Sequence, residues 1–212
     1  IMALFGLLAV VLTPWMWALL SSFKPRSEIM STGILPREWR LSSYIELFEL
    51  TLFPYWLMNS VIVSVSAAVL GMAVCAMAAY GFAKFRFFGQ GALFWIVIAS
   101  VSIPPFTTVI PLFGWLARLG LLNTYPVLVL PFAASAFGLF MMRQYMATLP
   151  GELIEAARID GCGDFRLFFT IVVPLSRPAI GTVGILIFIA SWNSYIWPLI
   201  FMRAEDMFTL PV

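Results

Sequence analysis

Residues 50–83 read LTLFPYWLMNSVIVSVSAAVLGMAVCAMAAYGFA, a continuous stretch without a charged residue. A helix of about 20 apolar residues crosses the hydrocarbon core of a bilayer, so this stretch is long enough to span one. Small residues recur at every fourth position, at Ala67, Gly71, Cys75 and Ala79. They form one stripe on which another helix can approach closely. The stretch therefore predicts a membrane-spanning helix whose stripe packs either within the chain or against a second subunit.

The rest of the chain is similarly apolar. Hydrophobic residues make up 62% of the 212 residues and charged residues 10%, whereas soluble domains carry about a quarter charged residues. Each charge near the centre of a bilayer costs roughly 2.5 to 3.5 kcal/mol, so charge-free stretches mark the spans. We expect five spans, at about residues 1–22, 56–84, 90–116, 122–145 and 178–201. The chain is thus predicted to be an all-α, polytopic transmembrane helical bundle that forms a single domain over residues 1–212.

The third expected span contains a break at Ser102-Ile103-Pro104-Pro105. Proline lacks a backbone donor and its ring clashes with the preceding helical turn. Irregular backbone at membrane depth is tolerated only against protein or a water-filled cavity. We therefore expect a kink that either lines a pathway or shapes the bundle.

Several function classes are excluded by the residues that the sequence lacks. Histidine is absent, which removes His-Glu-x-x-His metal sites and Ser-His-Asp triads. Neither lysine, Lys24 or Lys84, follows a glycine as the lysine of a phosphate-binding loop must. The balance of 12 basic and 10 acidic residues does not indicate nucleic-acid binding. Cys75 lies in an apolar run and Cys162 in a polar loop, so we expect no disulfide between them. The chain is predicted to be no enzyme and to bind no cofactor or metal.

Two polar segments separate the spans. Residues 24–55 predict an irregular loop with a short helix near Ser42 to Leu50. In residues 146–177, the stretch from Leu149 to Gly161 predicts a short helix outside the membrane. Pro150 lies in its first turn, an acidic residue follows near the positive end of the helix dipole, and the glycine ends the helix.

The surface of this short helix is suited to contact with another protein. Ala156 and Ala157 leave a low surface between Glu155 and Arg158, which fits a groove better than a core. Asp164 is expected to cap a second helix that runs to Val172. Three phenylalanines would hold that second helix against the bundle or the bilayer interface: Phe165, Phe168 and Phe169.

The same loop resembles a known motif. Glu155-Ala156-Ala157 is followed after three residues by Gly161, after nine more by Ile171, and then by Val173-Pro174. This pattern resembles the EAA motif of ABC importer permeases, with valine where that family usually has leucine. The segment from Trp192 to Leu199 is similar to the fifth span of carbohydrate-type permeases related to the smaller subunit of the maltose transporter.

The resemblance implies the fold of a type I ABC importer permease in a bacterial inner membrane. It implies that loop 146–177 is cytoplasmic and presents a coupling helix to an ATP-hydrolysing subunit, which would bind ATP and magnesium. The implied coupling residues are Glu152, Glu155, Ala156, Ala157, Asp160, Gly161 and Pro174. Basic residues alone leave the orientation open, because they divide six against six between the two sides.

Further partners follow from the resemblance: a second permease subunit, two copies of the ATPase subunit and an extracytoplasmic solute-binding protein. Loop 24–55 and the segment from Arg203 would then lie outside. The family normally has a sixth span, so we expect the natural start and the final span to be missing from this chain.

The substrate is the least specified property. Trp192, Asn193 and Tyr195 offer aromatic and amide groups, and the expected spans hold no charge in their central turns. A neutral saccharide therefore fits better than a phosphate ester, although these aromatic residues also suit an interfacial belt. Two alternatives remain at this point: an ion-coupled secondary transporter and a membrane assembly subunit.

Overall fold

The computed structural model describes residues 2–25, 27–29 and 33–212, and every regular element within these ranges is a helix. This confirms the predicted all-α class. Ile1, Arg26 and residues 30–32, which belong to the expected first span and external loop, lie outside the described residues. The chain divides into two units, Ile1–Pro54 and Tyr55–Val212.

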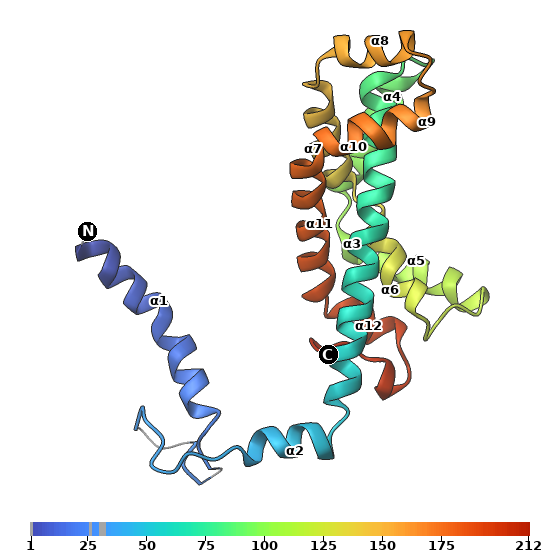
Figure 1. Ribbon diagram of the computed structural model, residues 1–212. Coiled ribbons are helices and arrows are strands. Elements are labelled where there is room, and N and C mark those ends of the chain that lie inside the picture. Colours follow the sequence, from blue (N-terminus) through green and yellow to red (C-terminus); the bar gives the residue numbers. More distant parts are fainter. Residues whose placement is uncertain (1, 26, 30–32) are drawn as a thin grey trace. The chain divides into compact units, whose positions relative to one another are not determined.

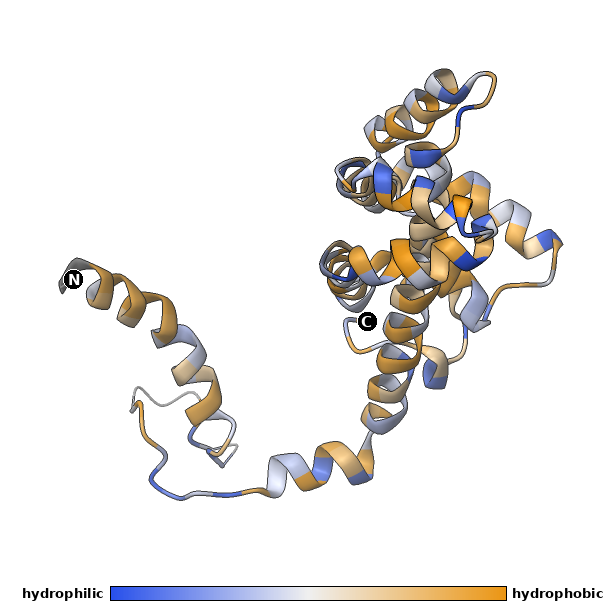
Figure 2. Ribbon diagram, turned by 45° about the horizontal axis from the view of Figure 1, so that its top comes forward, coloured by the Kyte–Doolittle hydropathy of each residue, from blue (hydrophilic) through white to orange (hydrophobic). Residues whose placement is uncertain are grey.

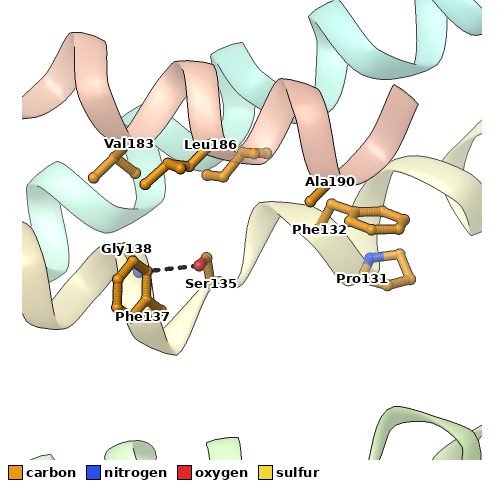
Figure 3. Close-up of a pocket in the computed structure, with 9 residues that line it drawn as sticks. Pro131, Phe132, Ser135, Phe137, Gly138, Val183, Leu186 and Ala190 are labelled. Carbon is orange, nitrogen blue, oxygen red and sulfur yellow. Dashed lines mark hydrogen bonds between the residues drawn. The ribbon is translucent and has the colours of Figure 1, made fainter. Parts of the chain in front are cut away.

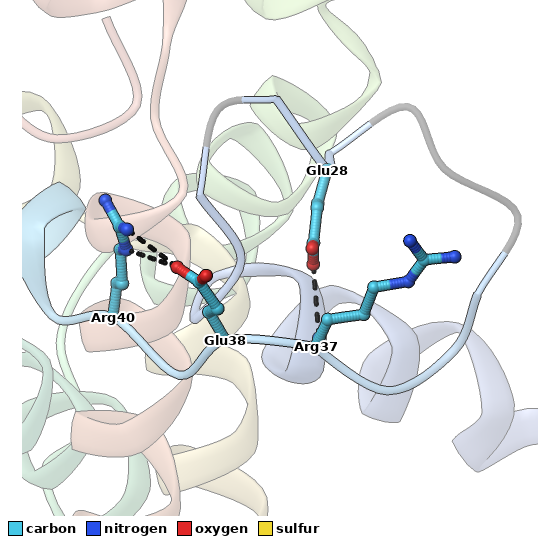
Figure 4. A network of polar contacts seen from close by, with 4 residues as sticks. All are labelled: Glu28, Arg37, Glu38 and Arg40. Carbon is cyan, nitrogen blue, oxygen red and sulfur yellow. Dashed lines mark hydrogen bonds and ion pairs between the residues drawn. The ribbon is translucent and has the colours of Figure 1, made fainter.

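The first unit contains two helices joined by a loop. Helix α1 (Met2–Ser21) is apolar throughout, and its described side chains are largely exposed. Helix α2 (Ser42–Leu50) forms where the short helix was expected. Charged residues of the loop contact one another (Figure 4): the Arg40 guanidinium lies 2.6 Å from the Glu38 carboxylate, and the Arg37 N–H donates to Glu28 at 3.1 Å.

The second unit is built on the long helix α3 (Phe53–Lys84), whose first residues belong to the first unit. Figure 1 shows α3 beside α11, and Figure 2 shows hydrophobic residues along most of these helices. The remaining elements are α4 (Gln90–Ala99), η1 (Ser100–Ser102), α5 (Pro105–Arg118), α6 (Tyr125–Ala133), α7 (Ala136–Ala147), α8 (Gly151–Ile159), α9 (Asp164–Leu167), η2 (Phe168–Val172), α10 (Val173–Leu175), α11 (Arg177–Trp192), α12 (Ile196–Phe201) and η3 (Glu205–Met207).

The small-residue stripe of α3 packs inside this unit. Ala67, Gly71, Cys75 and Ala79 are all buried. A Cβ atom added at Gly71 would lie 2.5 Å from the Ile187 side chain on α11 and 3.4 Å from the backbone of α6. Of the two alternatives, packing within the chain is therefore confirmed, and the stripe is not a free surface for a second subunit.

Two described helices, α1 and α3, are long and apolar enough to cross a membrane unbroken. Three further pairs qualify only as bent spans: Gln90–Ser102 with Phe106–Arg118 at 103°, Tyr125–Ala133 with Ala136–Ala147 at 41°, and Asp164–Leu175 with Arg177–Trp192 at 80°. The number of spans reaches five if each pair is one span, by length and composition. The five-span topology stays a prediction.

The positions of the breaks differ from those expected. The break before Pro105 is confirmed, because α4 and η1 end there and a new helix begins. The sequence reading missed a second break, between α6 and α7, where the Ser135 side chain accepts a hydrogen bond from Gly138 N and caps the new helix. It also missed the end of α11, where the Asn193 side chain donates to the Ile189 carbonyl at 2.9 Å. Both breaks lie inside apolar runs.

At the first turns of α3, side chains hold the C-terminal segment by hydrogen bonds. Trp56 Nε1 donates to the Glu205 carbonyl at 2.7 Å. Asn59 Nδ2 donates to the carbonyls of Asp206 and Phe208 at 2.7 and 2.9 Å, and Asn59 Oδ1 accepts from Tyr125 at 2.7 Å. We call these contacts the Asn59 cluster. It ties α3, α6 and residues 205–208 together around the buried side chain of Asn59.

Candidate functional site

Helix α8, which carries the EAA-like sequence, lies at one end of the second unit (Figure 1). Its inner face is held by Ile154 and Ala157, which are 6% and 9% exposed. Its outer face presents the side chains of Glu152, Glu155, Ala156, Ile159 and Asp160. Only the first of the two alanines is therefore available to a partner. The expectation that both form a docking surface is wrong for Ala157, which packs into the core.

Gly161 ends α8 in the expected way. Its φ is +79°, which residues with a Cβ adopt only at a cost of about 1 to 2 kcal/mol. The Gly161 N–H donates to the Arg158 carbonyl at 3.0 Å and the Cys162 N–H to the Ala157 carbonyl at 2.9 Å. These two bonds form a Schellman motif, which satisfies the last carbonyls of the helix. No atom lies within 4 Å of a Cβ built at Gly161, so backbone conformation, rather than space, requires glycine here.

Two further contacts fix the position of α8. Lys84 Nζ, at the end of α3, donates to the Leu149 carbonyl just before α8 at 2.8 Å. Arg158 Nη2 donates to Asp164 Oδ1 at 2.9 Å, and this hydrogen bond raises the pKa of the Arg158 guanidinium. Arg158 thus pairs with Asp164, and Glu155 stays on the outer face. The expectation that Asp164 caps the next helix is wrong, because Gly163 holds the cap position and Asp164 is the first helical residue.

The second helix of the loop is longer than expected and is not a regular α-helix. It runs from α9 through the π-turn η2 into α10, which contains Pro174 and ends at Leu175. In a regular α-helix a proline ring clashes with the carbonyl four residues earlier, and the wider π-turn lies directly before Pro174. Phe168 is buried and packs on Tyr80 with ring centroids 5.2 Å apart, whereas Phe165 and Phe169 are exposed. Of the three phenylalanines, Phe168 alone anchors this segment in the bundle.

The three residues expected to face a substrate gather at the break between α11 and α12. The Trp192 ring stacks on Phe188 at 5.5 Å, and Asn193 bonds the carbonyl of Ile189 in its own helix. Tyr195 is 46% exposed. The three residues thus lie at the same break, but the side chains of Trp192 and Asn193 already contact other residues of α11.

A cavity of about 300 Å³ opens at the break between α6 and α7 (Figure 3). Sequence reasoning missed it, although a proline, a serine and a glycine within eight residues signalled a break. Ser135 is its hydroxyl-bearing residue, and the Ser135 carbonyl accepts a hydrogen bond from Cys75 Sγ at 3.4 Å. The lining residues are Pro131, Phe132, Ser135, Phe137, Gly138, Val183, Leu186, Ile187 and Ala190.

Broken apolar helices around an intrachain cavity, with a short helix presented at one end, are an arrangement suited to a membrane transport subunit. Residues 71–212 match the family described as binding-protein-dependent transport system inner membrane component, and the chain belongs to this family. It is therefore a multi-pass inner-membrane permease of an ABC importer, as the resemblance implied. The family assignment favours this reading over the secondary transporter and the assembly subunit.

Relatives agree with this assignment. The chain is 38% identical over 204 residues to the diacetylchitobiose uptake system permease protein NgcG of Streptomyces coelicolor, covering 95% of this chain and 68% of that protein. It is 37% identical over 208 residues to the arabinooligosaccharides transport system permease protein AraQ of Halalkalibacterium halodurans, covering 96% and 75%. Both are permeases, which transport solutes and are not enzymes.

The fold also matches a solved structure. That crystal structure is of a bacterial ABC transporter involved in the import of the acidic polysaccharide alginate. The match has a TM-score of 0.89 and 26% sequence identity, and it covers 99% of this chain and 74% of the other. The predicted permease fold is confirmed.

Proposed function

We propose that this chain forms half of the translocation pathway through which an ATP-driven importer takes up a carbohydrate. The relatives named for diacetylchitobiose and arabinooligosaccharides support a saccharide, and so does the likeness to the alginate importer. On this chain, Trp192, Asn193 and Tyr195 would offer aromatic stacking and neutral hydrogen bonds. A second permease subunit would supply the other half of the pathway.

The observation that carries the proposal is the outer face of α8. Glu155 and Ala156 are exposed on a helix that Gly161 closes rigidly and that Lys84 ties to α3. Such a helix can enter a cleft on an ATPase subunit and transmit its movement. Moving a two-state equilibrium from 1:99 to 99:1 takes about 5.5 kcal/mol of differential binding, which a loosely placed helix could not transmit.

The remaining partners follow from this role. ATP and magnesium would be bound by two copies of a separate ATPase subunit, so this chain needs no cofactor of its own. Loop 146–177 would face the cytoplasm, and loop 24–55 and the segment from Arg203 would face outward. There they would meet an extracytoplasmic solute-binding protein that delivers the carbohydrate.

Uptake into proteoliposomes tests the energy source. The chain is reconstituted with its second permease and ATPase subunits, and labelled oligosaccharide is supplied with the solute-binding protein. Because the solute-binding protein is outside, we expect uptake that requires ATP enclosed in the lumen and that is unaffected by collapse of ion gradients. Uptake that continues without ATP and stops when the sodium or proton gradient is collapsed would support a secondary transporter instead.

Charge reversal tests the coupling face. Glu155→Lys should reduce co-purification of the ATPase, because an exposed carboxylate at the docking surface changes sign. Glu49→Lys, on an exposed position of α2, is the matched control and should leave co-purification unchanged. Full retention of the ATPase by Glu155→Lys, together with wild-type uptake, would remove Glu155 from the docking surface.

Thiol labelling tests the orientation. In a background without Cys75 and Cys162, Glu152→Cys and Glu38→Cys place single thiols on two exposed positions. An impermeant reagent applied to intact cells should label the residue at position 38 and spare the one at position 152. The reverse pattern would overturn the orientation.

A further inference from the structure

A cavity separate from the α6–α7 break lies between the ends of three helices. Its volume is about 350 Å³. The last turn of α3, the first turns of α4 and the last turns of α7 form its wall. The lining residues are Phe82, Gln90, Gly91, Phe94, Trp95 and Arg143. Five of the six carry no charge, so Arg143 sets the electrostatic character of the cavity.

The cation of Arg143 has no anionic partner among the described residues. Its guanidinium carbon lies 4.8 Å from the centre of the Phe94 ring, and Nη1 donates to Gln144 Oε1 at 2.9 Å. Its Nε is buried and makes no hydrogen bond within the described chain. Residues 82–100 and 136–147, which build this region, contain neither aspartate nor glutamate. The cavity therefore presents the positive charge of a guanidinium without an anionic partner and with an N–H donor to spare.

The position of the cavity along the apolar helices fits a membrane interface. Apolar helices end near it, since α3 ends at Lys84 and α7 ends at Ala147. Arg143 is four residues from the end of α7, or about 6 Å along its axis. Trp95 is 69% exposed beside it, and tryptophan is enriched where headgroups meet acyl chains. The positive end of the α4 dipole, at Gln90 and Gly91, also faces this region.

We propose that this cavity binds the phosphate of an anionic phospholipid, with Arg143 as its ligand. Basic pockets between membrane helices are suited to anionic headgroups, and arginine forms strong charge-assisted hydrogen bonds to phosphate. The aromatic walls at Phe94 and Trp95 give an acyl chain a surface that free phosphate does not need. The combination of the Arg143 cation with the aromatic side chains therefore favours a lipid over a soluble anion.

Photocrosslinking of the assembled transporter tests the site. The complex is placed in nanodiscs of phosphatidylcholine with a small fraction of photoreactive phosphatidylglycerol, and adducts are mapped by peptide mass spectrometry. We expect adducts on the peptide that contains Phe94 and Trp95. Arg143→Gln should lower them roughly tenfold or more, because a charge-assisted hydrogen bond is lost. Arg143→Lys should retain most of the adduct.

The control is Arg177→Gln, which removes an exposed arginine at the start of α11 and should leave the adduct unchanged. Unlabelled phosphatidylglycerol should compete for the site, whereas inorganic phosphate in excess should not. Size-exclusion profiles and Tm values establish that each variant is folded and assembled.

Three results would overturn the proposal. The first is an equal yield of adduct from wild type and Arg143→Gln. The second is competition by inorganic phosphate as effective as that by the lipid, which would indicate a site for a soluble anion. The third is loss of the second permease from Arg143→Gln without any lipid adduct in wild type, which would indicate that a protein carboxylate occupies the cavity.

Discussion

The two ends of α3 are held in different ways. At its first turns, the Asn59 cluster joins side chains to backbone carbonyls by part-buried hydrogen bonds. At its last turn, one lysine bonds the Leu149 carbonyl, and α8 beyond it depends on the backbone of Gly161 and on an exposed ion pair. The first end is stabilised by several side-chain hydrogen bonds, and the second by backbone geometry that leaves the outer face of α8 exposed. The docking role that we propose for α8 requires a fixed position and an open face, and the second arrangement provides both.

This comparison predicts the largest loss of stability at the first end. Asn59→Ala removes three hydrogen bonds from a side chain that is itself buried, and each such bond contributes about 1 kcal/mol. We expect the free energy of unfolding to fall by roughly 3 kcal/mol, measured as a lower Tm of the purified complex. Asn193→Ala, which removes a single bond on an exposed residue, is the control. Equal Tm values for the two variants would show that the Asn59 cluster does not stabilise the fold.

A substitution in the middle of α3 should cause an intermediate loss of stability. Gly71→Leu forces a side chain into Ile187 and the α6 backbone, and overpacking of this kind costs about 1 to 3 kcal/mol. Gly81→Leu, in the same helix with no atom within 4 Å of the added Cβ, should leave Tm nearly unchanged. A Gly71→Leu complex of normal Tm that has lost its second permease would return the stripe to the role of subunit interface.

At the second end, Gly161→Val should cost about 1 to 2 kcal/mol locally, because valine resists a positive φ. The protein should stay in the membrane, but transport should be abolished, since α8 would no longer end in its docking position. Gly163→Val is a close control, because Gly163 has φ −70° in the extended region, which valine accepts. Uptake by both variants at the wild-type rate would contradict the coupling role of this loop.

The smallest effect is expected at the ion pair beside α8. The Arg158 and Asp164 side chains are 46% and 50% exposed, and exposed pairs contribute about 0 to 1 kcal/mol. Asp164→Asn should therefore lower Tm slightly in low salt and hardly at all in high salt, because salt screens the pair. Glu38→Gln breaks the comparable exposed pair with Arg40 and should behave alike. A large, salt-independent loss for Asp164→Asn alone would mean that the pair is a principal support of α8.

Local chemistry in the sequence predicted the features that depend on one residue and its neighbours. A glycine that ends a helix and a double proline that breaks one act through their own backbone, so Gly161 and the break before Pro105 were predictable. Apolar length likewise predicted a helical membrane protein. The match of 155–174 to a known motif then supplied the family.

Features that depend on distant partners were not predictable in the same way. Ala157 is buried because the hydrophobic core lies beneath α8. Arg158 pairs with Asp164 because the turn between α8 and α9 brings the two side chains together. The sequence allowed the small-residue stripe of α3 to pack against another chain. The position of Ile187 shows that it packs within this chain. The breaks at Ser135 and Asn193 lie in apolar runs. A hydropathy profile averages over such runs and does not reveal a single polar residue that ends or begins a helix.

The length of α3 has a mechanical meaning. With 32 residues at 1.5 Å each, the helix is about 48 Å long, whereas the hydrocarbon core measures about 30 Å. From Asn59 to Lys84 alone, the rise is about 38 Å, which exceeds the thickness of that core. If α3 spans the membrane as we propose, a tilt imposed on α8 by a docked protein would reach residues 205–208 through this single helix, with no charged relay inside the bilayer.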